Sequence, residues 1–225
     1  MLGSGKTKGM LNRLLSVFLE SRCPFCDRPT AEYLCQYCSA NLSTQQFASN
    51  DRLKLYRTRS TFAWGRYEGL LKRAIALMKY DCQPVIGEIL GTFLGQAWCD
   101  SGLSKLHPHL AVVPIPMHLQ KQKLRGFNQA EIIAHSFCQV TGYRLNKQTL
   151  IRTRATEAMF NLVSISARAK NLEGALQIGA KLPKRPVLLI DDIYTTGTTV
   201  DEAVKTLQLH KIKVIGVAVA AKAGR

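Results

Sequence analysis

Residues 187–200 read Val-Leu-Leu-Ile-Asp-Asp-Ile-Tyr-Thr-Thr-Gly-Thr-Thr-Val, a hydrophobic run followed by two acids and a hydroxyl-rich turn. Four branched aliphatic residues in succession, preceded by Pro186, predict a buried strand of a parallel sheet. From Val200 onward, apolar residues recur at the spacing of one helix face. The segment therefore predicts a strand, a turn and a helix of an open α/β sheet, whose ligands bind at the carboxyl ends of its strands.

The turn after this strand has the composition of an anion site. A helix N-terminus offers unpaired N–H groups and the positive end of the helix dipole. The residues that we expect to hold a phosphate are Thr195, Thr196, Gly197, Thr198 and Thr199. Asp191 and Asp192 would repel a phosphate at contact distance, so we expect them to accept hydrogen bonds from sugar hydroxyls. Together these residues describe a ribose 5-phosphate site; the alternative is an ordinary corner with a hydroxyl N-cap.

Length and charge limit the classes of protein to consider. The 225 residues, of which 46% are hydrophobic, suffice for one α/β core with a small appendage. The formal net charge of +16 favours a polyanionic partner, either nucleic acid or an anionic membrane face, although it also fits a solubilising surface. No apolar run approaches the roughly 20 residues that span a bilayer, so we expect neither an integral membrane protein nor a signal peptide.

Four of the seven cysteines form one cluster, Cys23-x2-Cys26-x8-Cys35-x2-Cys38. Four thiolates at this spacing suit a structural zinc site without an open coordination position; an iron–sulfur cluster is the competing interpretation. We expect Phe25, Tyr33 and Tyr37 to wrap the metal, and Cys82, Cys99 and Cys138 to be buried as small hydrophobic residues. This cysteine usage indicates a reducing cytoplasm.

A second segment of the sequence predicts the same arrangement of strand, anion-binding loop and helix. Residues 110–116 read as a buried strand that ends at two prolines, and a helix begins near Ala130. The loop between them contains Arg125 and Gly126, which offer a positive charge and close backbone approach to a diphosphate. Both predicted loops lie at the carboxyl ends of strands, so we expect them to share one edge of the sheet.

The remaining segments define three predicted regions. Residues 1–22 read as a basic tail and a short amphipathic helix, residues 23–60 as the zinc-binding module and a basic linker, and residues 61–225 as the main domain. The linker interleaves Arg52, Lys54, Arg57 and Arg59 with aromatic residues, a composition that suits single-stranded nucleic acid as well as it suits a solvated linker.

Three signatures occur in one order: the four-cysteine cluster, Val113-Pro114-Ile115-Pro116 with Arg125-Gly126-Phe127-Asn128-Gln129, and Asp-Asp-x-x-Thr-Thr-Gly at 191–197. Together they resemble the ComF family (ComFC/GntX type) of phosphoribosyltransferase-like competence proteins. The resemblance implies a type I phosphoribosyltransferase fold, with an open parallel sheet, helices on both faces and zinc on the cysteines. It also implies a cytoplasmic role, at or near the inner membrane, in carrying single-stranded DNA inward with the transport machinery.

Two functions are favoured by the sequence; a third, a regulator that senses 5-phosphoribosyl-1-pyrophosphate (PRPP), is open but lacks a DNA-reading motif such as a helix-turn-helix. In the first, a pocket for PRPP is the core of a competence factor that binds single-stranded DNA. In the second, the chain transfers ribose 5-phosphate from PRPP to an acceptor that the sequence does not reveal. In that case Asp191, Asp192 and Arg125 are the candidate catalytic residues, with Arg125 on the pyrophosphate beside Mg²⁺.

Overall fold

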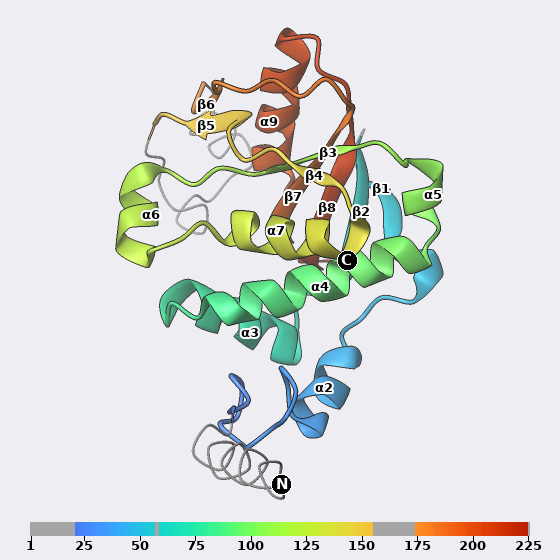
Figure 1. Ribbon diagram of the computed structural model, residues 1–225, viewed down its shortest axis with the longest axis vertical. Coiled ribbons are helices and arrows are strands. Elements are labelled where there is room, and N and C mark those ends of the chain that lie inside the picture. Colours follow the sequence, from blue (N-terminus) through green and yellow to red (C-terminus); the bar gives the residue numbers. More distant parts are fainter. Residues whose placement is uncertain (1–20, 57–58, 155–173, 225) are drawn as a thin grey trace, which may run out of the picture. The chain divides into compact units, whose positions relative to one another are not determined.

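The computed structural model describes residues 21–56, 59–154 and 174–224 (Figure 1). The chain divides into two compact units, Met1–Thr44 and Gln45–Arg225. The tail and amphipathic helix expected over residues 1–22 lie almost entirely outside the described residues. Within the described part of the smaller unit, the helix α2 covers Gln36–Ser43.

A six-stranded sheet in the order β1-β2-β8-β7-β3-β4 forms the centre of the larger unit. All neighbouring strands are parallel except β1 and β2, which are antiparallel. The strands are β1 (Leu53–Tyr56), β2 (Arg59–Arg66), β3 (Ala111–Pro114), β4 (Arg144–Leu145), β7 (Val187–Tyr194) and β8 (Val214–Lys222). The predicted α/β class with a largely parallel sheet is therefore confirmed.

Helices and a small hairpin complete the larger unit. The hairpin pairs β5 (Leu150–Arg152) with β6 (Leu176–Ile178) in antiparallel fashion. The helices are η1 (Ser49–Asp51), α3 (Gly69–Tyr80), α4 (Pro84–Asp100), α5 (Leu103–Leu106), α6 (Leu119–Arg125), α7 (Gln129–Thr141) and α9 (Thr198–Leu209). Among the helices of the described residues, none is both long and apolar enough to cross a membrane.

The central strand β7 is buried on both faces. Val187 and Leu189 belong to one hydrophobic cluster with Val204 and Leu207 of α9. Residues of a strand alternate between faces, so Leu188 points to the opposite side, where α4 and α7 lie. Figure 1 shows α9 above the strands and α4 and α7 below them. Cover on both sides explains why residues 187–190 of β7 are continuously hydrophobic rather than alternating.

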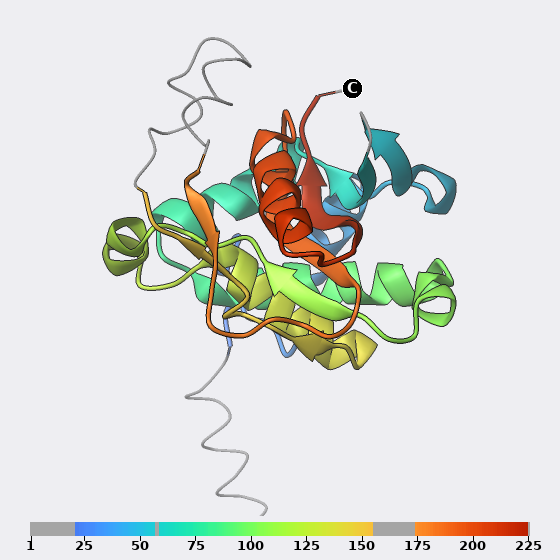
Figure 2. The ribbon, with the colours of Figure 1, turned by 90° about the horizontal axis from the view of Figure 1, so that it is seen from above.

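Glycines let α4 and α7 approach each other closely. Gly87, Gly91 and Gly95 recur every fourth residue and so share one face of α4. A Cβ at Gly91 would meet the carbonyl oxygen of Ile133 and lie 2.9 Å from the Cβ of Ser136, both on α7. Seen from above, in Figure 2, the two helices run beneath the sheet in the same layer.

Residues 45–60 belong to the larger unit instead of forming a linker. Leu53–Tyr56 pairs with β2 as a strand at the edge of the sheet. Arg52 is only 9% exposed, and its Nε donates a hydrogen bond to the carbonyl oxygen of Phe47 at 3.2 Å. Arg59 Nε lies 3.7 Å from Asp201 Oδ1. Two of the cations expected to track a nucleic acid are therefore engaged within the fold.

Replacing Gly91 by leucine tests the close packing of α4 on α7. Leucine favours helices more than glycine does, so any loss of stability must come from overpacking. We expect Gly91→Leu to lower the free energy of unfolding by about 2 kcal/mol or more in urea titrations. Gln96→Leu, at an exposed position of the same helix, is the matched control and should change it by less than about 0.5 kcal/mol. Equal effects of the two variants would contradict the close approach.

Candidate functional site

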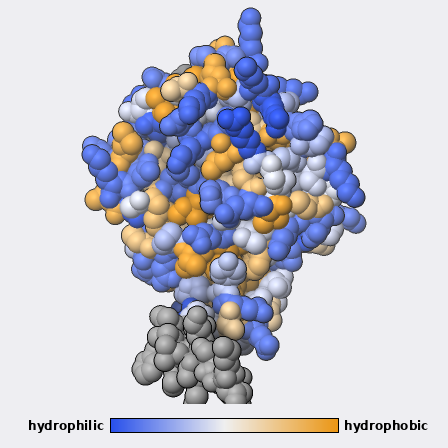
Figure 3. Space-filling view, in the orientation of Figure 1, coloured by the Kyte–Doolittle hydropathy of each residue, from blue (hydrophilic) through white to orange (hydrophobic). Residues whose placement is uncertain are grey.

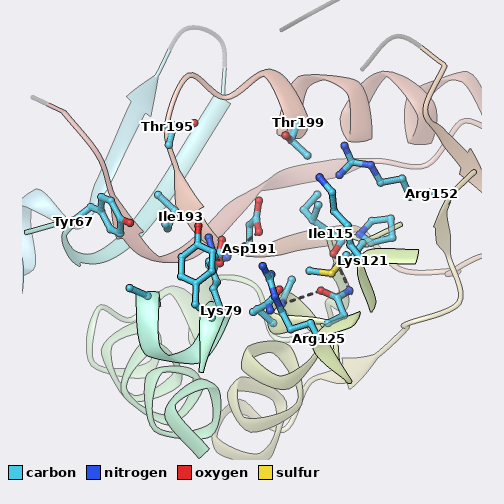
Figure 4. A pocket seen from close by; sticks show the side chains of 18 residues that line it. Tyr67, Lys79, Ile115, Lys121, Arg125, Arg152, Asp191, Ile193, Thr195 and Thr199 are labelled. Atoms are coloured by element: carbon cyan, nitrogen blue, oxygen red, sulfur yellow. Dashed lines mark hydrogen bonds and ion pairs between the residues drawn. The ribbon is translucent and has the colours of Figure 1, made fainter. Parts of the chain in front are cut away.

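The predicted acid pair lies at the carboxyl end of β7 and opens into a cavity of about 470 Å³. Asp191, Asp192, Thr195 and Thr199 all line this cavity. Figure 4 shows Asp191 in the middle of it, with Thr199 toward α9. A volume of this size lies within the range of small-ligand sites in proteins. The sheet thus places its carboxylates where an open α/β fold binds ligands.

A lysine from α3 holds one of the two acids. Lys79 Nζ lies 2.7 Å from Asp192 Oδ2, and both side chains are largely buried. The backbone N–H of Asp192 donates to Asp191 Oδ1 at 2.9 Å, which fixes the second carboxylate. Burial would lower the pKa of Lys79, but attraction to Asp192 raises it above the ordinary value. Lys79 therefore stays charged and offsets part of the negative charge in the cavity.

The other carboxyl group, that of Asp191, has a strongly perturbed pKa. Burial and the negative charge of Asp192 raise it to about 8, although Lys79 and the Asp192 N–H act in the opposite direction. A carboxyl group with this pKa changes its protonation state near neutral pH. It can donate a hydrogen bond to a ligand when protonated and accept one from a hydroxyl when ionised.

The turn after β7 leads directly into the N-terminus of α9. Gly197, the N-cap residue, has φ +79°, and a Cβ there would collide with Tyr194 Oη. Glycine is therefore required both by the left-handed conformation and by the space. The hydroxyl oxygens of Thr196 and Thr198 lie 2.7 Å apart and bond to each other. Of the four threonines predicted to bind phosphate, the structure places Thr195 and Thr199 on the cavity.

Positive side chains form a second wall of the cavity. Lys121 and Arg125 come from α6 and Arg152 from β5, and all three line the cavity. Figure 4 shows them on one side of Asp191, with Tyr67 on the other. Burial lowers the pKa of Lys121, and the positive charges of Arg152 and Arg125 lower it further. This convergence of cations favours an anionic ligand group such as a diphosphate.

The segment that follows Arg125, between α6 and α7, is anchored by a buried asparagine. Asn128 caps α7 by accepting from the Ala130 N–H at 3.2 Å, and its Nδ2 donates to the carbonyl oxygen of Ile115 at 3.1 Å. These bonds tie the start of α7 to the end of β3. Gly126 ends α6 in the left-handed conformation and lies outside the cavity lining, so the structure does not bring it to the acid pair.

Sequence reasoning did not assign several residues that line the cavity, namely Tyr67, Lys79, Tyr80, Lys121 and Arg152. The sequence shows Lys79 and Tyr80 only as the end of a helix, and a cation in the last turn of a helix has an ordinary structural explanation. Lys121 lay in the basic loop already singled out. Arg152 lies on the short strand β5, 39 residues before Asp191, and nothing in the sequence indicates that these two residues share a cavity.

The four clustered cysteines come together in the smaller unit. Their Sγ atoms all lie within 4.8 Å of one another, and those of Cys26 and Cys35 are 3.5 Å apart. Sulfurs bound at about 2.3 Å around a tetrahedral ion would be separated by similar distances. The donor set therefore fits a metal ion held by four thiolates.

Local backbone bonds shape this cluster. The N–H of Asp27 donates to the Cys23 carbonyl at 2.8 Å, and that of Cys23 donates to the Arg28 carbonyl at 2.9 Å, which closes a tight turn around the first pair. Asp27 adopts the left-handed conformation at φ +59°. The second pair, Cys35 and Cys38, occupies the N-cap and first turn of α2, where the helix dipole favours thiolates.

Two expectations about the cysteines and aromatic residues were wrong. Phe25 is buried beside the cluster, but Tyr33 and Tyr37 are 71% and 63% exposed, and the Arg28 guanidinium carbon lies 4.9 Å from the ring centroid of Tyr37. Cys82 is exposed at the loop between α3 and α4, and Cys99 and Cys138 are only partly buried, so none of the three is the fully buried residue that we expected.

Comparison with known proteins finds relatives that are named as competence proteins. It is 28% identical to competence protein ComFC of Bacillus subtilis over 191 residues, 82% of this chain and 70% of that protein. It is also 28% identical to competence protein F of Haemophilus influenzae, over 87% of this chain and 84% of the relative. The chain is a homologue of ComF-type competence proteins. The resemblance drawn from the sequence is thereby confirmed.

Further comparisons cover less of the chain. The DNA utilization protein YhgH of Escherichia coli K12 is 29% identical over 96 residues, 43% of this chain and 42% of that protein. No family model matches the chain. A hypoxanthine phosphoribosyltransferase from Staphylococcus aureus is a structural neighbour with 18% identity and a TM-score of 0.36, over 59% of this chain and 61% of that one. The fold assignment here follows from the strand order.

The pKa of Asp191 predicts how stability depends on pH. The folded state raises this pKa from about 4 to about 8, so between these values the folded chain holds a proton that the unfolded chain releases. This contribution to stability is present at low pH and is lost as pH rises toward 8. We expect Asp191→Asn to melt at a higher temperature than the wild type at pH 9, with little difference near pH 4. An advantage that grows toward low pH would contradict the raised pKa.

Proposed function

We propose that the cavity at the end of β7 binds a ribose 5-phosphate ligand, PRPP with Mg²⁺, and that the chain acts in DNA uptake. The observation that supports this ligand assignment is that three kinds of binding group surround one cavity: a pair of acids, a helix N-terminus with threonines, and a wall of cations. The homologues named for competence and DNA utilization support the biological role.

Each part of PRPP has a matching surface in this proposal. The 5-phosphate binds the N-terminus of α9 with Thr195 and Thr199, because the first helical N–H groups lack internal partners. Asp191 and Asp192 accept hydrogen bonds from the ribose hydroxyls. The diphosphate binds the wall that contains Arg125, since arginine pairs with phosphate through two parallel hydrogen bonds.

The balance of charge in the cavity explains the position of Lys79 and the need for Mg²⁺. Lys79, Lys121, Arg125 and Arg152 bring four positive charges to the lining of the cavity, against the carboxylate of Asp192 and the carboxyl group of Asp191, whose pKa of about 8 leaves it largely protonated near neutral pH. PRPP carries more negative charge than this difference, and Mg²⁺, which prefers oxygen ligands and accompanies phosphates, would supply the remainder. Lys79 would keep the acid pair from repelling the incoming ligand, because it already neutralises Asp192.

Single-stranded DNA is the second ligand that we propose, on a surface separate from the cavity. The net charge of +16 supports it, and Figure 3 shows hydrophilic residues spread over one face, with hydrophobic ones in small patches. Affinity for single strands should fall steeply with salt concentration. For each phosphate that the protein neutralises, a tenfold rise in salt should lower the logarithm of the affinity by about 0.7. We propose that the chain works at the cytoplasmic side of the inner membrane with the DNA-transport machinery.

A phosphoribosyl transfer reaction is the alternative function. The carboxyl group of Asp191, with a pKa of about 8, lies at the place proposed for the ribose and favours this alternative. Such a group exchanges protons near neutral pH, as acid–base catalysts do. Release of pyrophosphate from PRPP in the presence of nucleobases or single-stranded DNA would establish turnover, whereas binding without release supports a ligand-binding role.

Calorimetric titration with PRPP and Mg²⁺ tests the proposed ligand. We expect the double variant Asp191→Asn/Asp192→Asn to lose at least about tenfold in affinity, because each charge-assisted hydrogen bond contributes about 1.5–3 kcal/mol. Asp100→Asn, an exposed acid at the end of α4, is the control and should bind as the wild type does. Wild-type chain that gives no binding heat, or a double variant that binds equally well, would refute the proposal.

We propose zinc as the metal of the four-cysteine cluster, since four thiolates in a tetrahedral array are its typical structural ligands. Purified chain should release about one zinc ion per molecule when its thiols are blocked, measured with a colorimetric zinc indicator. Cys35→Ser should lose the metal, and Cys82→Ser, outside the cluster, should keep it. A visible absorption band typical of iron and sulfide in the wild type would point to the competing cluster instead.

A further inference from the structure

Three exposed leucines lie on the connections that lead into β3, β7 and β8, at the end of the sheet that we call the amino edge. Each occurs five residues before its strand begins: Leu106 before Ala111, Leu182 before Val187 and Leu209 before Val214. Their side chains are 70%, 52% and 74% exposed, in that order. A single exposed leucine is ordinary on a protein surface, whereas three on connections to neighbouring strands require an explanation.

Backbone hydrogen bonds hold the starts of these three strands side by side. The Val187 N–H donates to the Lys213 carbonyl oxygen at 2.8 Å, and the Ala111 N–H donates to the Pro186 carbonyl oxygen at 2.9 Å. Neighbouring strands of a sheet lie about 4.8 Å apart. The connections before β8, β7 and β3 therefore reach the surface next to one another.

The connections that carry the leucines are basic and contain no acid. They comprise residues 101–110, 179–186 and 208–213. All of their lysines and arginines are exposed, namely Lys105, Lys181, Lys184, Arg185, Lys211 and Lys213. Among the described residues, none of these side chains forms an ion pair with an acid. The amino edge therefore presents a positively charged surface that favours an anionic partner.

The composition of the amino edge matches an anionic bilayer better than it matches a nucleic acid. Peripheral membrane proteins combine apolar side chains that enter the lipid with cations that attract anionic headgroups. Single-stranded nucleic acid is instead bound by cations together with aromatic rings that stack on the bases. The three connections contain no phenylalanine, tyrosine or tryptophan. We propose that the amino edge docks the chain on an anionic membrane surface, with Leu106, Leu182 and Leu209 inserted between the headgroups.

Docking through the amino edge leaves the cavity accessible. The cavity opens at the carboxyl end of β7, and this strand of eight residues extends about 23 Å from its first residue to its last. The leucines precede the opposite ends of the strands, so a docked chain presents the cavity away from the bilayer. This inference rests on the proposed place of the chain at the inner membrane, and it does not depend on which ligand the cavity binds.

Sedimentation of the full-length chain with lipid vesicles tests the inference. The vesicles consist of phosphatidylcholine, either alone or with about 30% phosphatidylglycerol as the anionic lipid. We expect the wild type to bind the anionic vesicles at least about tenfold more tightly, because each cation near such a surface contributes about fivefold. The variant Leu106→Ser/Leu182→Ser/Leu209→Ser should bind them at least about tenfold more weakly, since its side chains no longer favour the lipid.

Two further variants make the test specific. Lys184→Gln/Arg185→Gln/Lys213→Gln should also weaken binding to the anionic vesicles at least about tenfold, because it removes three positive charges. Leu119→Ser/Leu124→Ser is the matched control, since these leucines are 66% and 86% exposed on α6, beyond the carboxyl end of β3. This control should bind both kinds of vesicle as the wild type does. Melting temperatures of all variants verify that they are folded.

Several results would overturn the inference. These are equal binding of the wild type to both kinds of vesicle, undiminished binding by the leucine variant of the amino edge, and an equal loss in the α6 control. A charge variant that loses affinity for single-stranded DNA but keeps its affinity for vesicles would also overturn it, because the amino edge would then bind nucleic acid. Titration with PRPP is a separate measurement, so each of these results leaves the proposed ligand of the cavity intact.

Discussion

The burial of β7 on both faces is the constraint on which the site depends. A strand covered by α9 on one side and by α4 and α7 on the other has no room for charge along its length, so its polar residues gather where it emerges. Asp191 and Asp192 occupy that point, and the ion pair between Lys79 and Asp192 at 2.7 Å makes their burial tolerable. The same geometry places the turn and the N-terminus of α9 beside them. Fold and site are thus consequences of one hydrophobic strand.

The local parts of this arrangement could be predicted from the sequence. The aliphatic run, the acid pair and the glycine of the turn are neighbours in the chain, and so are the paired cysteines of the metal cluster. Gly197 illustrates why: its left-handed conformation is a property of one residue and its immediate contacts. The helix and strand at 187–209 follow from periodicity alone.

The parts that sequence could not supply depend on tertiary contacts. Lys79 meets Asp192 across 113 residues, and nothing in the last turn of a helix distinguishes a buried ion pair from a solvated lysine. Residues 53–56 seemed to be a linker because an edge strand tolerates polar residues, and only its pairing with β2 reveals it. The mutual bond of Thr196 and Thr198 engages one of the hydroxyl donors that composition alone would count as free for a ligand.

Structure determination of the chain with bound ribose 5-phosphate would test the central claim most directly. The account predicts the phosphate at the N-terminus of α9, within hydrogen-bond distance of the Thr199 N–H, and the sugar hydroxyls on Asp191 and Asp192. A phosphate bound instead at the cationic wall of Arg125 and Arg152, with the sugar turned away from the acids, would contradict it. So would a cavity that stays free of the sugar phosphate at saturating concentration.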